Sequence, residues 1–523
     1  MNGPFSGRSL ETIERTDTVE SASLLTHQHE RLTKADTISV EQERLGKADT
    51  GLGDDGEMVV EVDTVVPSPF SAASFNDEGH LPIPIQPTSI KPLTTLTYAA
   101  LALCATGGGG FGLEGVVRAG GIGLTILGFS TIPLFWAVPQ AAAAAEMSSI
   151  FPVNGGPIVW VSRVLGPSAA WINGWNWQLS NVIDLALYPV LAAQYISAGR
   201  GWSWLALTSI KFFIVTLVAL LNCARIDVLG RISWGIIFLS IVPFLIMFGW
   251  GAAEHQLQYD HTTDGVPDVN WGLFLSILLW SSTGWDCVAA TAGDVHDLPK
   301  AVPRGTVLAM VLNIVLCVFP LVVTYWLNPD ATLFVDGYFT TAAFSIAPSL
   351  GYAMIIAAVL ANVAQFNALF AASARSLWAM GNPDAEESDS PLQTAPTWVS
   401  WEWRETRVPI VAIAINYLLT MGFCLLPFDQ LVQMDVLLNN VCLLFEFASY
   451  MRLKYTDGIE RPIEVPFGKV GAWMITVPKM SLVLWTMSEA GWETLLWGLG
   501  VNVVILLGLV VRLRNTSRRR KLR

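Results

Sequence analysis

Five glycines stand within six positions of an apolar stretch that is long enough to cross a membrane. The run Gly107-Gly-Gly-Gly-Phe-Gly112 lies in a mainly apolar segment from about Leu93 to Val117, and a spanning helix needs about 20 residues. Each glycine costs about 1 kcal/mol relative to alanine inside a helix, so we expect the helix to break here. Hydrocarbon cannot satisfy the released backbone groups, so the break should face a cavity that holds water or a ligand.

A second apolar stretch, over about residues 270–293, is interrupted in the same manner by Trp280-Ser-Ser-Thr-Gly-Trp-Asp286. Two interrupted spans in corresponding places of two halves are typical of the midplane binding site of a secondary transporter. The alternative is that the glycines only permit close helix–helix packing. That use usually shows spaced small residues rather than four in a row.

The composition indicates a polytopic membrane protein. Of 523 residues, 52% are hydrophobic and only 14% are charged, and the mean hydropathy is +0.49, whereas soluble domains carry about 25% charge. The net charge of -13 comes largely from acidic residues in the first ninety positions and in loops, so no nucleic-acid partner is expected. The six cysteines lie in apolar stretches without CxxC spacing, which predicts buried free thiols.

No motif of a soluble enzyme is present. The chain has no P-loop, no HExxH, no GxSxG and no clustered Cys and His residues, each of which would carry a recognisable chemistry. We therefore expect a protein that is not an enzyme and that uses neither a cofactor nor a bound metal.

Composition divides the chain into three parts. Residues 1–88 form a polar tail, which we expect to be disordered and cytoplasmic because it holds too little apolar surface to fold alone. Residues 89–513 form a transmembrane transporter domain, and residues 514–523 a basic cytoplasmic C-terminus. Residues 30–37 of the tail recur with one change at 43–50, as either a plain linker feature or a regulatory motif used twice.

About twelve apolar segments of roughly 20 residues follow the tail. Their approximate extents are 91–117, 121–150, 168–198, 203–224, 229–252, 270–293, 304–327, 350–379, 408–426, 430–453, 470–489 and 491–513. With a cytoplasmic N-terminus, the outside connections hold only Arg118 and Arg200, and all other flanking Lys and Arg residues fall inside. This asymmetry predicts that both termini are cytoplasmic.

Ionisable residues inside spans are functional candidates, because each costs at least about 2.5 kcal/mol at the bilayer centre. The acids of this kind are Glu114, Glu146, Asp184, Asp286 and Glu446. Asp184 lies deep in the third span and is the hardest to explain structurally. Glu146 and Glu446 lie near cytoplasmic ends, where snorkelling or a structural ion pair is equally compatible with the sequence.

Carboxylates around a midplane cavity suit a cationic substrate. The aromatic residues Tyr188, Trp280 and Trp285 either add cation–π attraction to an amine or only pack the core. Two cations, Arg375 and Lys479, also lie within spans. Lys479 is the deeper of the two; the sequence favours snorkelling at the periphery, with pairing to an acid or a proton step as alternatives.

Several motifs resemble the amino acid–polyamine–organocation superfamily, and most closely the polyamine:proton symporters of plants and protists. They are Gly108-Gly-Gly-Phe-Gly-Leu-Glu114, Phe151-Pro-Val-Asn-Gly-Gly-Pro157, Gly174-Trp-Asn-Trp-Gln-Leu-Ser180, Val182-Ile-Asp-Leu-Ala-Leu-Tyr-Pro189, Trp285-Asp286, Leu444-Phe-Glu-Phe447 and Arg461-Pro-Ile-Glu-Val-Pro466. The resemblance extends over about residues 91–513. It implies a LeuT-type fold of two inverted five-helix repeats plus two further helices, with substrate between the broken first and sixth helices.

The resemblance also implies which residues bind substrate. Backbone contacts would come from the two breaks, Trp280 would be a gating aromatic, and acids would stand at Glu114, Asp184 and Asp286. The expected binding set is Gly107, Gly108, Gly109, Gly110, Glu114, Asp184, Tyr188, Trp280, Ser281, Ser282, Thr283, Gly284, Trp285 and Asp286. The loop at 196–203 lacks the cysteine with which related light chains bind a heavy-chain glycoprotein, so no such partner is expected.

The expected function is proton-coupled symport of polyamines or cationic amino acids by alternating access, in the plasma membrane, with lipid, the small cation and the proton as partners. Two departures from the family keep other substrates open. Pro139-Gln-Ala141 replaces a Pro-Glu-Ala run, and Leu369-Phe-Ala-Ala-Ser-Ala-Arg375 replaces a run with two acids. The alternatives are an exchanger or uniporter for neutral or varied amino acids, and a transporter-like nutrient sensor.

Overall fold

The computed structural model describes residues 94–106, 109–151, 156–197, 200–224, 228–254, 268–286, 298–382, 394–403 and 408–522. These residues are helical or in loops, without a β-strand. Within them, eight helices are long and apolar enough to cross a membrane, and shorter apolar helices accompany them. The prediction of an all-helical polytopic membrane protein is therefore confirmed, while the predicted tail, 1–88, lies outside the described residues.

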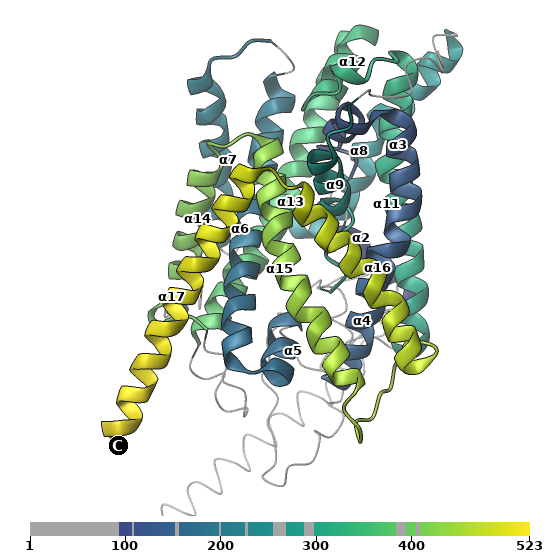
Figure 1. Cartoon of the computed structure of the whole chain (residues 1–523). Helices are drawn as coiled ribbons and strands as arrows, with labels where there is room; N and C mark the ends of the chain where they lie inside the picture. The colour runs from purple at the N-terminus through teal and green to yellow at the C-terminus, as the bar shows by residue number, and fades with distance from the viewer. Residues whose placement is uncertain are drawn as a thin grey trace, which may run out of the picture. The chain divides into compact units, whose positions relative to one another are not determined.

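Figure 1 shows the helices running mostly along one common direction, with α12 at the upper end and α5 at the lower end. Their bounds are α2 (Thr95–Thr106), α3 (Glu114–Phe135), α4 (Ala137–Ile150), α5 (Gly156–Leu165), α6 (Pro167–Ser197), α7 (Trp204–Cys223), α8 (Val228–Ala253), α9 (Trp271–Trp280), α11 (Leu298–Leu327), η4 (Ala331–Leu333), α12 (Tyr338–Ile346), α13 (Pro348–Gly381), η6 (Thr397–Ser400), α14 (Ile410–Phe423), α15 (Phe428–Lys454), α16 (Gly468–Glu489) and α17 (Trp492–Leu522). Helix α17 thus continues through the expected boundary at residue 513.

The glycine run breaks the first apolar stretch. Helix α2 ends at Thr106 and α3 begins at Glu114, and between them Gly109 and Gly112 have φ angles of 97° and 83°. Such left-handed backbone is readily adopted only by glycine. A further non-helical glycine, Gly121, divides α3 near its start, which is where the sequence placed the boundary between the first two apolar segments.

The second break follows α9. Asn270 caps the start of this helix, because its side chain accepts a hydrogen bond from Leu273 N at 3.1 Å. The helix ends at Trp280, and Gly284 has a φ of 104°. The carbonyl oxygen of Ser281 accepts a hydrogen bond from Asn313 Nδ2 of α11 at 3.1 Å, so part of the released backbone is satisfied inside the protein.

Helices α6 and α15 form the centre of the bundle. Their most apolar windows are each 72% buried, against 28% for α7 and 22% for α17. Helix α6 packs against α5, α7, α13, α14, α15 and α17. In Figure 1, α17 correspondingly lies along the outside of the bundle. The described cysteines are free thiols; Cys317, Cys424 and Cys442 are buried as expected, whereas Cys223 is only half-buried.

A buried ion-pair network fastens the lower end of the bundle. Lys454 Nζ of α15 lies 2.8 Å from Glu146 Oε1 of α4, and both side chains are 2% exposed. Arg461 Nε lies 3.5 Å from the same oxygen. The other oxygen, Oε2, accepts hydrogen bonds from Tyr450 and from the backbone N–H of Val465. Glu146 is therefore a structural ion-pair partner, which is one of the two roles that the sequence left open.

A more exposed ion pair joins α3 to α15 at the upper end. Arg118 Nη2 lies 2.6 Å from Asp429 Oδ2, and the two side chains are 33% and 36% exposed. Asp336, in the loop before α12, lies near this pair and is half-buried. The pKa of Asp336 is raised to about 7, chiefly by burial and secondly by the Asp429 carboxylate, while the Arg118 guanidinium acts to lower it.

We expect Asp336→Asn to stabilise the protein more at pH 8 than at pH 5. The folded wild type keeps Asp336 protonated up to about pH 7, whereas the unfolded chain releases that proton near pH 4. Folding therefore binds a proton between those values, and wild-type stability falls as the pH rises. Thermal unfolding of both proteins in detergent measures the effect, with the exposed Asp457→Asn as control. A Tm difference that is the same at both pH values would contradict the assignment.

Candidate functional site

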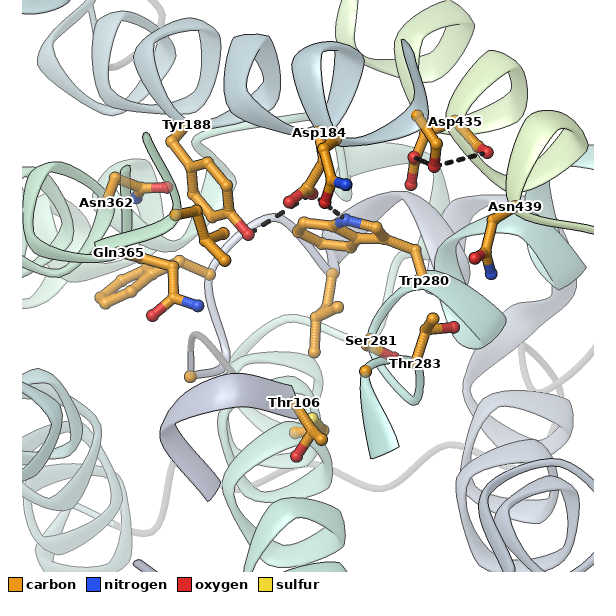
Figure 2. A pocket seen from close by; sticks show the side chains of 18 of the residues that line it. Thr106, Asp184, Tyr188, Trp280, Ser281, Thr283, Asn362, Gln365, Asp435 and Asn439 are labelled. Atoms are coloured by element: carbon orange, nitrogen blue, oxygen red, sulfur yellow. Dashed lines mark hydrogen bonds between the residues drawn. The ribbon is translucent and has the colours of Figure 1, made fainter. Parts of the chain in front are cut away.

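A cavity lies between the two helix breaks and opens onto α6, α13 and α15 (Figure 2). Its water-accessible volume is about 130 Å³, which is room for several water molecules. The lining residues are Thr106, Gly109, Phe111, Leu113, Trp177, Ser180, Asn181, Asp184, Tyr188, Trp280, Ser281, Thr283, Gly284, Asp286, Cys317, Ala361, Asn362, Gln365, Leu369, Asp435 and Asn439. The released backbone of both breaks thus borders a cavity, as helices broken inside a membrane require.

One face of α6 supplies much of the polar lining. Trp177, Ser180, Asn181, Asp184 and Tyr188 recur at intervals of one, three and four residues, and positions three or four apart share a helix face. Because α6 is the most enclosed part of the bundle together with α15, this face brings a carboxylate into a buried position. The same sequence pattern therefore explains how Asp184 reaches the cavity.

Asp184 is held by two aromatic donors. Trp280 Nε1 donates a hydrogen bond to Asp184 Oδ1 at 2.8 Å, and the Tyr188 hydroxyl donates to the same oxygen at 3.4 Å. Figure 2 shows the carboxylate between these two rings, whose centroids lie 6.3 Å apart. A carboxylate offers about four acceptor positions, so capacity remains for a ligand amine beside two aromatic faces.

Asp435 of α15 is a second carboxylate in the cavity, and the sequence analysis missed it. Its Oδ1 accepts a hydrogen bond from Ser180 Oγ of α6 at 2.5 Å. Asn439, one turn further along α15, also lines the cavity (Figure 2). The signal was present in the chain, because an acid and an amide four residues apart share one face of an otherwise apolar helix. Asp435 stands early in its span, where it resembles a flanking charge.

The described cavity lining is acidic and includes no basic side chain. It contains the three aspartates Asp184, Asp286 and Asp435 and no Lys, Arg or His. Amides from α13, Asn362 and Gln365, complete the polar surface. A cleft lined by one sign of charge attracts the opposite sign, so this cavity suits a small cation that carries hydrogen-bond donors.

The predicted binding residues divide between this cavity and its supports. Those that line the cavity are Gly109, Asp184, Tyr188, Trp280, Ser281, Thr283, Gly284 and Asp286. Those that lie outside the lining are Gly110, Glu114, Ser282 and Trp285, and Gly107 and Gly108 fall outside the described residues. Trp285 donates its indole N–H to the carbonyl oxygen of Ser282 at 2.9 Å, which folds the second break back on itself.

Glu114 stabilises the backbone of the first break through hydrogen bonds and does not face the cavity. It is fully buried, and its Oε1 accepts a hydrogen bond from the Tyr195 hydroxyl at 2.7 Å. Its Oε2 accepts one from the backbone N–H of Gly112 at 3.1 Å. The Tyr195 oxygen accepts a second bond from that same N–H at 2.8 Å. These contacts satisfy backbone that the break releases, as a buried polar group requires.

Gly110 serves close packing. A Cβ at this position would lie 2.6 Å from Pro320 Cγ and 2.9 Å from the Leu316 carbonyl oxygen of α11, which is too close for any side chain. At Gly109 a Cβ would meet only Ser240 Oγ, at 3.5 Å. The glycine run therefore combines packing at one position with an open, left-handed backbone at the other.

The departure from the family on α13 places an apolar residue at the cavity. Leu369 lines it, whereas Ser373, one turn later, belongs to a buried network outside the lining. Gln178 of α6 donates to Ser373 Oγ at 3.1 Å, and Asn416 of α14 donates to it at 3.0 Å. The carboxylates of the described cavity consequently come from α6, α15 and the second break, with none from α13.

Comparison with known proteins gives one consistent family. The amino acid permease family profile matches residues 93–510. The chain is 30% identical to the polyamine transporter RMV1 of Arabidopsis thaliana over 429 residues, which is 81% of this chain and 85% of that protein. It is 28% identical to the polyamine transporter PUT1 of Oryza sativa subsp. japonica over 456 residues, or 84% and 81% of the two chains. The amino-acid permease BAT1 of Arabidopsis thaliana is 22% identical over 442 residues, or 76% and 82%.

Proposed function

Because the chain belongs to the amino acid permease family, we propose that it is a proton-coupled symporter of polyamines or cationic amino acids that works by alternating access. One observation carries the proposal. The described lining of the cavity between the two breaks holds three aspartates and no basic side chain. Similarity to plant polyamine transporters over about four fifths of the chain supports a cationic substrate.

The charge of the cavity favours polyamines over amino acids. An amino acid would bring its own carboxylate among Asp184, Asp286 and Asp435, and among the described lining residues no cation would balance it. Like charges at close range repel, most strongly where water is excluded. A linear polyamine instead carries two or more ammonium groups, each a donor of charge-assisted hydrogen bonds, and it meets carboxylates on α6 and α15 with an apolar stretch near Leu369.

The proposed fold is of the LeuT type with twelve spans. Helix α2 and residues 109–120 form the broken first span, and α9 with the residues that follow Trp280 forms the broken sixth. The remaining spans correspond to residues 122–150 of α3 and α4 and to helices α6, α7, α8, α11, α13, α14, α15, α16 and α17. Two inverted five-helix repeats place such breaks opposite each other at the membrane midplane.

The proposed orientation places both termini in the cytoplasm and the protein in the plasma membrane. The excess of Lys and Arg in the connections assigned to the inside supports it. The network around Glu146 then lies at the cytoplasmic end and Asp336 at the outer end. The partners are the bilayer, the small cation and a proton, without a disulfide-linked heavy chain.

Ligand-induced stabilisation tests the substrate class directly. Purified protein is screened against putrescine, spermidine, arginine and leucine, because a ligand that binds the folded form raises its Tm by mass action, the more so the higher its concentration relative to its Kd. Stabilisation by polyamines and uptake driven by an inward proton gradient support the proposal. Stabilisation by leucine alone favours an exchanger or uniporter of neutral amino acids. Binding without any uptake in liposomes favours a nutrient sensor.

We expect Asp435→Asn to weaken the binding of polyamines more than that of monoamines. Spermidine affinity should fall about fivefold, equivalent to about 1 kcal/mol, because the second ammonium loses a charged partner. A monoamine that reaches only Asp184 should change less than about twofold. Competition of putrescine, spermidine and butylamine against labelled spermidine measures both effects. Equal losses for diamines and monoamines would contradict a second amine subsite at Asp435.

A further inference from the structure

A buried lysine stands apart from the substrate cavity. Lys479 of α16 is 0% exposed, and its Nζ donates hydrogen bonds to the Trp136 carbonyl oxygen and to Gln140 Oε1, both at 3.1 Å. The same Nζ lies 3.2 Å from the centroid of the Trp136 ring, so cation–π attraction adds to these bonds. The ammonium thus points into the protein, and these contacts are to a carbonyl oxygen, an amide oxygen and an aromatic ring rather than to a carboxylate.

Two buried acids interact electrostatically with this lysine. Glu446 of α15 and Asp286, which follows the second break, are each 1% exposed, and each interacts electrostatically with Lys479 and with the other. Leu443 and Phe447, on either side of Glu446, pack in one apolar cluster with Trp136 and with Val483, one turn beyond Lys479. The three charged groups therefore belong to one small region between α15, α16 and the second break.

The elements packed around Lys479 contribute few other titratable groups. Helix α4 faces it with the neutral amide of Gln140, and α9 contains no titratable residue. On α15, the Cys442 thiol interacts with Asp286 and Glu446. Within the described residues, Glu446 Oε1 has no hydrogen-bond partner, which is uncommon for a buried carboxylate. An oxygen in that position is available to a proton.

Two connections join this cluster to the substrate cavity. Asp286 itself lines the cavity. In addition, Trp136 Nε1 donates a hydrogen bond at 3.3 Å to Thr283 Oγ1, and Thr283 lines the cavity within the second break. Trp136, whose ring face lies against the Lys479 ammonium, is therefore hydrogen-bonded through its indole N–H to the second break.

We propose that Asp286, Glu446 and Lys479 form the proton-binding site that couples substrate transport to proton movement. Two carboxylates and one ammonium carry a net charge of -1, and binding one proton makes the cluster neutral. A buried uncompensated charge costs free energy, so the protonated and deprotonated clusters favour different arrangements of the second break. A proton from hydronium in the cavity forms an O–H bond at a carboxylate oxygen of Asp286, is held by the carboxylate pair, and is returned to water on the opposite side, so only O–H bonds form and break.

Gln140 fits this assignment. A carboxylate at that position would give Lys479 a partner of its own and would neutralise its charge locally. The neutral amide leaves the ammonium as the counter-charge of Asp286 and Glu446 alone. The inference rests on the proposed symport function, because the site has a role only if a proton moves with the substrate.

The test separates proton movement from substrate movement. Purified protein in liposomes loaded with a pH-sensitive dye is given spermidine outside, and internal acidification is recorded beside labelled spermidine uptake. For Glu446→Gln we expect acidification to fall at least about fivefold, while exchange of internal for external spermidine stays within about twofold. The matched control is Glu489→Gln, an exposed acid at the end of α16, which should behave as wild type in both assays.

A second variant tests the same site in case Glu446→Gln does not fold. Lys479→Gln removes the counter-charge, so the carboxylate pair retains its proton and acidification should again be lost while exchange persists. If either folded variant acidifies the liposomes as strongly as the wild type does, the proposed proton site is wrong. The proposed transport function is then unaffected. Wild-type protein that takes up spermidine without acidification overturns both the coupling and this site. Failure of wild-type protein to move spermidine or arginine at all refutes the proposed function.

Discussion

Asp184→Asn should lower the apparent affinity for a cationic substrate at least about tenfold. The change keeps the volume of the side chain and removes its charge, so a charge-assisted hydrogen bond of about 1.5–3 kcal/mol is lost. The amide still accepts from Trp280 Nε1, whose bond to Asp184 Oδ1 is 2.8 Å in the wild type, and the ring should stay in place. Concentration-dependent uptake of labelled spermidine in liposomes measures the effect.

The control for Asp184 is Asp457→Asn, which removes an exposed carboxylate from the loop after α15. It lowers the net negative charge of the protein by the same amount without touching the cavity. Its affinity for spermidine should match that of wild type. Normal spermidine affinity in well-folded Asp184→Asn protein would show that another carboxylate carries the amine.

Gly109→Leu should abolish transport while the protein still accumulates. Gly109 has a φ of 97° and lines the cavity, so a leucine would occupy space that the ligand needs. The left-handed backbone adds about 1–2 kcal/mol of strain for a residue with a Cβ, which most folded proteins of this size tolerate. Uptake in liposomes, together with size-exclusion profiles of the purified variant, separates loss of function from loss of fold.

Gly166→Leu tests the effect of left-handed backbone strain separately from the effect of filling the cavity. Gly166, between α5 and α6, has a similar φ of 92°, and a Cβ there would meet no atom within 4 Å. This variant should therefore keep transport near the wild-type level. Should Gly109→Leu transport spermidine as Gly166→Leu does, the first break would not be part of the binding surface.

Local composition predicted the framework of the site well. The glycine run and the Ser281–Gly284 segment specify helix breaks through backbone preference alone, and both breaks are present. Asp184 was selected because a lone acid deep in a buried apolar helix is costly, and it reaches the cavity. The positions of the breaks and of Asp184 agree with the sequence because each depends on a few neighbouring residues, while substrate binding at them stays a prediction.

Roles that depend on packing were less accessible to the sequence. Glu114 stands directly beside the first break, yet its carboxylate turns to Tyr195, a residue 81 positions away. Asp435 was missed because its position in the cavity depends on the pairing of α15 with α6 through Ser180. For Lys479 the sequence left peripheral snorkelling open, and the packing of α16 against α4 instead buries it beside Gln140. Side-chain direction between distant helices is not encoded in a single span.

The two ends of the bundle are fastened by ion pairs of different kinds, and dissolved salt should therefore act on them unequally. Arg118 and Asp429 are about one-third exposed, and dissolved salt weakens such a solvent-accessible pair. Lys454 and Glu146 are 2% exposed, so mobile ions cannot reach them, and separating them would leave a buried charge alone. Raising the salt concentration should therefore weaken the Arg118–Asp429 pair and leave the Lys454–Glu146 pair nearly unchanged. Under the proposed alternating-access cycle, we expect ionic strength to bias opening toward the side of the Arg118–Asp429 pair.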